Sequence, residues 1–191
     1  MNVLNLSVLG ASSAPHPIVT VVLQTQKTGA VSLLSLIAEI KQQLGEMWLP
    51  QIYREQILTK RTRAYHLEVP SKRGTVEVQY TLLGVELKLG RRRVFCPDLA
   101  TARYLSVFAR IGNPNFGVPY DISQLSRLAD QLEFAWQRML LLIDHLAENR
   151  SKDFGARLRR KLITEVREEI TQAGAGADRP HFNQNTKQRP V

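Results

Sequence analysis

The sequence predicts an α+β fold, in which a three- to four-stranded, mainly antiparallel sheet packs against long helices and a disordered basic C-terminal tail follows. Apolar residues alternate with a period of two between residues 63 and 96, which is typical of half-buried strands. They recur at helical spacing over 33–58, 99–111 and 122–148. With 191 residues and 43% apolar content, the chain is long enough to bury one genuine core.

Four parts are expected along the chain. Residues 1–16 form a flexible N-terminal segment, and residues 17–149 form a single α+β core domain that begins with β-branched residues in a strand or extended arm. Residues 150–172 form a peripheral amphipathic helix that docks at the edge of the core or on a partner. Residues 173–191 contain too few apolar side chains to offset the entropy lost on ordering, which predicts a disordered basic tail.

Several helix boundaries are marked by the residues that favour them. Gly45 should interrupt the first helix. Asp98 should cap the second helix and Gly112 should end it. Asp121 with Gln124 three residues later resembles a capping box, so the third helix should begin there.

The third helix has an apolar seam with heptad-like spacing, and further apolar residues widen it. This seam predicts burial in a core or self-association, so a homo-oligomer through the 122–148 helix is one expected arrangement. An assembly or scaffold protein that binds an acidic protein partner is the corresponding function. The seam consists of Leu125, Leu128, Leu132, Ala135, Met139, Leu142 and Leu146.

The strands are expected to form an antiparallel meander after residue 63. The segment "TVEVQYTLL" places Val76, Val78, Tyr80 and Leu82 on one face, and we expect Tyr80 to be buried. The segments "VELKL" and "RRVFC" continue the sheet, with Cys96 as a buried residue where the last strand ends.

Positive charge is concentrated in the middle of the chain. The 26 Lys and Arg residues exceed the 17 Asp and Glu residues, which gives a net charge of +9. Ten basic and four acidic residues lie between Arg54 and Arg93, whereas the segment from Val94 to Asn149 is slightly acidic. An excess of this kind favours polyanionic partners.

The basic residues of this block predict a non-enzymatic binding or regulatory protein that contacts nucleic-acid phosphates through a cationic sheet and hairpin surface. Arginine suits phosphate because its planar guanidinium donates two parallel hydrogen bonds. Few aromatic residues lie nearby, so contact with the backbone is favoured over reading of bases. The predicted interface comprises Arg61, Arg63, Lys72, Arg73, Arg91, Arg92 and Arg93.

Other kinds of site have little support in the sequence. The four histidines are scattered and none has metal-ligand spacing, so we expect no metal and no cofactor.

The single cysteine excludes an intramolecular disulfide and suits a reducing compartment, which predicts a cytoplasmic location. The longest apolar runs are far shorter than the roughly 20 residues that a membrane span requires.

Glu86 and Lys88 suggest one enzymatic alternative. Both leave the same face of one strand, and Glu77 shares that face on the preceding strand. Carboxylates bind divalent metals, and a nearby lysine stabilises charge on a cleaved phosphodiester. The segment "VELK" resembles the (D/E)xK element of the PD-(D/E)xK nucleases, and the order of elements is similar over residues 30 to 120. The resemblance implies a magnesium-dependent nuclease, with Glu77 in place of the family's aspartate. The simpler interpretation is a solvated pair across a sheet face.

Overall fold

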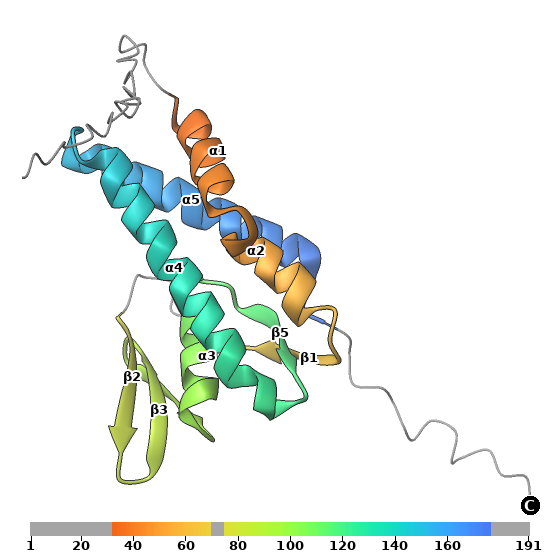
Figure 1. The fold of residues 1–191 in the computed structure, drawn as a ribbon. Coiled ribbons are helices and arrows are strands. Elements are labelled where there is room, and N and C mark those ends of the chain that lie inside the picture. The colour runs from red at the N-terminus through yellow and green to blue at the C-terminus, as the bar shows by residue number, and fades with distance from the viewer. Residues whose placement is uncertain (1–31, 70–74, 177–191) are drawn as a thin grey trace, which may run out of the picture. The chain divides into compact units, whose positions relative to one another are not determined.

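The computed structural model describes residues 32–69 and 75–176, and it confirms the predicted α+β fold. Helices make up most of these residues, and the strands form two antiparallel sheets (Figure 1). Within these ranges, no helix is long and apolar enough to cross a membrane. The expected N-terminal segment 1–16, the arm at 17–26 and residues 177–191 of the expected tail lie outside the described residues. The division into domains remains a prediction.

The N-terminal helical region is divided where the sequence predicts. Helix α1 (Leu33–Leu44) begins at Ser32, whose hydroxyl accepts a hydrogen bond from the amide of Ser35 (3.1 Å). It ends at Gly45, which has a positive φ of 51° that other residues rarely adopt. The 3₁₀ turn η1 (Gly45–Met47) leads to α2 (Leu49–Ile52), which continues into the π-helical turn η2 (Tyr53–Ile57). The break therefore fixes the direction of α2 relative to α1.

The central and C-terminal helices also follow their predicted signals. Helix α3 (Leu99–Ile111) is capped by Asp98, which accepts the Thr101 amide (2.7 Å), and it ends at Gly112 in the left-handed region. Asp121 caps the 3₁₀ turn η3 (Ile122–Gln124), and α4 (Leu125–Ala147) begins directly after it. Helix α5 (Lys152–Ala173) is the last element before the described range ends at residue 176. The capping residues were thus identified correctly, although Asp121 caps a short 3₁₀ turn before the α-helix.

The strands form two sheets where one was expected. Strands β2 (Val76–Thr81), β3 (Gly84–Leu89) and β4 (Arg92–Cys96) form an antiparallel meander, as predicted. Strand β1 (Thr62–His66) does not join it, because it pairs with β5 (Asn115–Pro119) in a separate sheet. The predicted meander is therefore confirmed in its three-stranded form, and β1 does not add a fourth strand because β5 is its partner.

Aromatic side chains fill the core between the helices and the β1–β5 sheet. The rings of Phe108 and Phe116 are stacked with centroids 4.1 Å apart, and Tyr53 and Tyr104 each contact Phe108. The buried hydroxyl of Tyr104 donates to the carbonyl of Gly117 (2.6 Å), so its polar group is satisfied. The core therefore ties α3 to β5.

The apolar faces of α4 and α5 are covered by the chain itself, and the two helices pack against each other (Figure 1). Most of the seam on α4 is fully buried, so these residues are not available for self-association in this fold. The helix expected at the periphery is equally part of the core, because its four apolar residues are buried. The buried residues are Leu125, Leu128, Leu132, Ala135 and Met139 on α4, and Leu158, Leu162, Val166 and Ile170 on α5.

The residues directly after α5 dock on the β1–β5 sheet. Tyr53 donates its hydroxyl proton to the carbonyl of Gly174 (2.6 Å) and accepts the amide of Gly117 (2.8 Å). A Cβ atom at Gly176 would lie 2.5 Å from the hydroxyl of Thr62, so only glycine fits there. The beginning of the expected tail is therefore packed, because small residues allow the backbone to approach the sheet closely.

Candidate nucleic-acid interface

Three consecutive arginines lie at the turn between β3 and β4. Gly90 has a positive φ of 62° and allows the tight reversal, which is followed directly by Arg91, Arg92 and Arg93. All three are exposed. The amide of Gly90 donates to the carbonyl of Thr75 (3.0 Å), so the beginning of β2 lies beside this turn. The arginine turn is therefore positioned by the backbone pairing of the whole meander.

Two of the three arginines have acidic neighbours. Arg92 forms an ion pair with Glu68, and both side chains are more than 60% exposed. Arg93 lies 3.5 Å from Glu86, measured between Nη1 and Oε2. Each guanidinium has five N–H donors, so both can contact a further oxygen-rich partner. No ion pair is found for Arg91 among the described residues.

The outer face of the meander has no excess of positive charge. Alternation along the strands places Glu77, Glu86, Lys88 and Arg93 on this face, opposite the face that carries the buried Leu87. Lys88 pairs with Glu77 (3.3 Å), and Arg93 pairs with Glu86. The two cations and two anions balance, so the remaining positive charges of the meander are Arg91 and Arg92, at the turn.

The other basic residues of the predicted interface lie on different segments of the chain. Arg61 and Arg63 are exposed on the other sheet, where the guanidinium of Arg61 lies over the ring of Tyr120 (5.0 Å). Lys72 and Arg73 lie outside the described residues.

A groove of about 360 Å³ lies beside the arginine turn, between the end of β1 and β4. Tyr65 contributes to this groove, but its ring packs against Phe116 (5.7 Å), and burial raises the pKa of its hydroxyl. His66 is held by Asn115 (2.8 Å). Base stacking therefore has little support here, whereas the exposed guanidinium groups remain accessible to phosphate. The groove is lined by Tyr65, His66, Leu67, Glu68, Arg92, Arg93 and Val94.

The other aromatic residue near the basic block differs from its prediction. Tyr80 was expected to be buried, but it is 72% exposed. It pairs in register with Val85 near the β2–β3 turn, whereas the fully buried Leu87 and Leu89 lie toward the other end of β3. The prediction was wrong because burial of the meander decreases toward this turn, where Leu82 and Leu83 are also exposed.

The residues of the nuclease alternative share one face, as their alternation predicts. Glu77 and Lys88 form the ion pair described above, and Glu86 is held near Arg93 with its side chain only 15% exposed. Oε2 of Glu86 is buried without a hydrogen bond, because its 3.5 Å separation from Arg93 satisfies only an ion pair. Within the described residues, no group of three or more His, Cys, Asp or Glu side chains is arranged to hold a metal. The shared face is the only geometric feature that favours this alternative.

Cys96 is buried at the end of β4, as expected. Burial raises the pKa of its thiol, although a hydrogen bond from the backbone of Leu87 opposes this effect. A raised pKa disfavours the nucleophilic thiolate. These properties agree with a packing residue.

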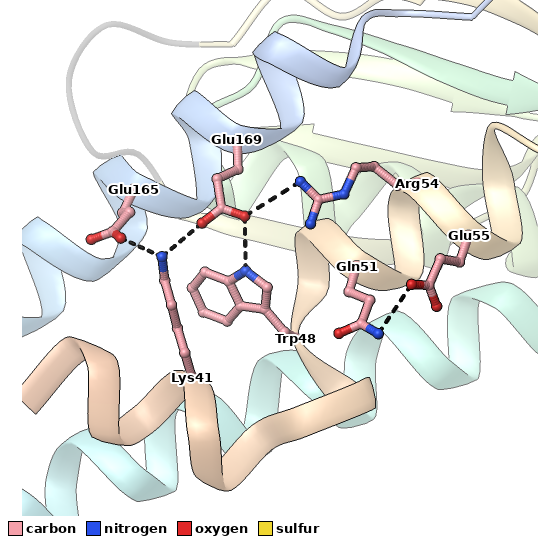
Figure 2. A network of polar contacts seen from close by, with 7 residues as sticks. All are labelled: Lys41, Trp48, Gln51, Arg54, Glu55, Glu165 and Glu169. Carbon is pink, nitrogen blue, oxygen red and sulfur yellow. Dashed lines mark hydrogen bonds and ion pairs between the residues drawn. The ribbon is translucent and has the colours of Figure 1, made fainter.

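The sequence did not reveal a polar network that joins α5 to the N-terminal helices (Figure 2). Lys41 lies between Glu165 and Glu169, with Nζ 2.8 Å from Oε1 of Glu169. The indole of Trp48 donates to Oε2 of the same carboxylate (3.0 Å), and Arg54 lies 3.7 Å from it. The spacing of Glu165 and Glu169, four residues apart on one helix, was the available signal, but nothing in the sequence indicated their partners, which lie more than 110 residues away.

Comparison of the chain with protein-family models, with curated proteins and with solved structures gives no match.

Proposed function

We propose that the protein binds nucleic acid through its phosphates, at the turn formed by Arg91, Arg92 and Arg93. The observation that supports this most directly is the exposure of three consecutive guanidinium groups on a turn whose backbone is fixed by strand pairing. Arginine matches phosphate in charge and in bidentate geometry. A fixed backbone reduces the conformational entropy that binding costs.

The existing ion pairs of the turn are compatible with this function. Exposed pairs such as Arg92 with Glu68 contribute little to stability, typically about 0–1 kcal/mol. A phosphate can therefore share or replace the carboxylate without a large loss of folding free energy. The ring of Tyr65 packs against Phe116, and the exposed rings of Tyr80 and Phe95 lie toward the β2–β3 turn at the other end of the meander, so the contact should discriminate weakly between base sequences.

The test is fluorescence anisotropy with a labelled single-stranded RNA and a labelled DNA duplex, measured from low to physiological salt. The triple variant Arg91→Ala, Arg92→Ala, Arg93→Ala should bind about tenfold or more weakly, and the slope of log affinity against log salt should decrease by about 3. The matched control is Arg157→Ala, Arg160→Ala, Lys161→Ala, which removes the same charge from exposed positions on α5.

The control variant separates a specific turn from the effect of total charge. We expect it to keep most of the affinity of the wild type. Equal losses in the two variants would show that net charge alone attracts nucleic acid and would reject the turn as the site. Binding that does not change with salt, or no binding to either nucleic acid, would reject the proposed function itself.

A further inference from the structure

Strand β2 lies at an edge of the meander and has the properties of a pairing strand. The strand order is β2-β3-β4, so within the described residues β2 pairs with β3 alone. Natural edge strands are usually protected by charged side chains, Pro or a bulge. The sequence of β2, "VEVQYT", contains no Pro and no Lys, its one charged residue, Glu77, pairs with Lys88 of β3, and its pairing with β3 runs through six residues without a bulge. This edge is therefore able to accept another strand.

The backbone groups that face outward from this edge follow from the hydrogen bond between Gly90 and Thr75. These two residues continue the β2–β3 register, so Thr75 directs its backbone groups toward β3. In antiparallel pairing every second residue does the same. The amides and carbonyls of Val76, Val78 and Tyr80 must then point away from β3, toward the free edge.

We propose that β2 pairs with β2 of a second copy of this chain, antiparallel and centred on Val78. This register uses all three outward-facing residues: Val78 pairs with Val78 of the second copy, and Val76 pairs with Tyr80 in both directions. A two-fold axis relates the two chains, as in most homodimers. The product is a continuous six-stranded sheet.

The side chains of β2 are self-complementary in the same register. Residues opposite each other in an antiparallel pair lie on the same face, so Tyr80 packs on Val76 of the second copy. This contact covers an aromatic ring that is 72% exposed in the single chain. On the other face, Glu77 lies opposite the neutral Gln79, so no two like charges are directly opposed.

The charge and register together favour a second copy over an unrelated strand. An unrelated strand would need its own apolar residues at matching positions, whereas the second copy supplies Val, Val and Tyr in the required order. The dimer does not depend on the proposed nucleic-acid binding. It uses the backbone of β2, whereas the proposed phosphate contacts use the side chains of the arginine turn between β3 and β4.

The experiment is sedimentation velocity of the nuclease-treated full chain over a range of concentrations, with circular dichroism to verify folding. The wild type should show a concentration-dependent dimer. Tyr80→Lys places two lysines in the interface and should produce a monomer. Val78→Pro should do the same, because it removes the central outward-facing amide and leaves the bonds from β2 to β3 in place.

Gln79→Lys is the matched control for Tyr80→Lys, because it adds the same charge to the neighbouring residue. In the proposed register, lysine at position 79 lies opposite Glu77 of the second copy, so the dimer should persist or become tighter. A wild type that remains monomeric at all concentrations would overturn the proposal. A dimer that survives both Tyr80→Lys and Val78→Pro, or that Gln79→Lys dissociates equally well, would overturn it too.

Discussion

The helical region and the β2-β3-β4 meander use their charged residues in opposite ways. Among the helices, Lys41, Trp48 and Glu169 form a partly buried network that connects segments more than 120 residues apart (Figure 2). On the meander, Glu77 and Lys88 pair only between neighbouring strands, and the side chain of Glu77 is 45% exposed, compared with 21% for Glu169. The comparison indicates that charges in the helical region connect distant segments of the fold, whereas those on the outer face of the meander pair locally between adjacent strands.

The largest expected effect tests whether α5 belongs to the core. Leu162 is fully buried, so Leu162→Ala should lower the free energy of unfolding by about 2–5 kcal/mol through lost burial and a residual cavity. The matched control is Leu141→Ala on α4, where the side chain is 66% exposed and the expected change is within about 0.5 kcal/mol. Urea denaturation measures both. Similar values for the two variants would mean that α5 is peripheral.

An intermediate effect is expected from Glu169, the centre of the polar network. Burial alone would raise the pKa of Glu169, but hydrogen bonds from Lys41 and Trp48 outweigh it and lower the pKa below its ordinary value. A lowered pKa in the folded state contributes stability above the ordinary glutamate range, which is lost as the pH falls through the folded pKa. Glu169→Gln should therefore cost about 2 kcal/mol at neutral pH and reduce the loss of stability in acid.

Thermal or urea unfolding between pH 3 and 7 measures this effect. The control is Glu55→Gln, which alters an exposed carboxylate that bonds only to the side chain of Gln51 and should change stability little (Figure 2). If Glu169→Gln were as stable as the wild type at neutral pH, the network would not hold the helices together.

The two regions also differ in how well the sequence predicts them. Local signals were sufficient for helix ends, because Asp98 and Gly112 act through backbone groups within a few residues. They were also sufficient for the β2-β3-β4 meander, whose strands are adjacent in sequence. The pairing of β1 with β5 and the contact of Lys41 with Glu169 could not be predicted, because each joins segments separated by a large part of the chain.

Charge counting had a similar limit at the candidate interface. The sequence identified the arginine turn correctly as an exposed basic segment, since three consecutive arginines cannot all be buried. It did not reveal that Glu86 would neutralise Arg93 or that Glu68 would pair with Arg92, because both depend on strand register and on the path of the chain after β1. The net charge of a segment therefore does not show which of its charges are paired on the surface that it forms.

The smallest expected effect concerns the outer face of the meander. The pair of Glu77 with Lys88 has side chains that are 45% and 33% exposed, so water and salt screen it. A double-mutant cycle with Glu77→Gln and Lys88→Gln, measured by urea denaturation, should give a coupling energy of about 0.5 kcal/mol or less that decreases as salt is added. A coupling above about 1.5 kcal/mol that persists at high salt would instead assign this pair the same structural role as the helical network. The weak coupling expected here follows from the exposure of both side chains, whereas Glu169 is held by several donors.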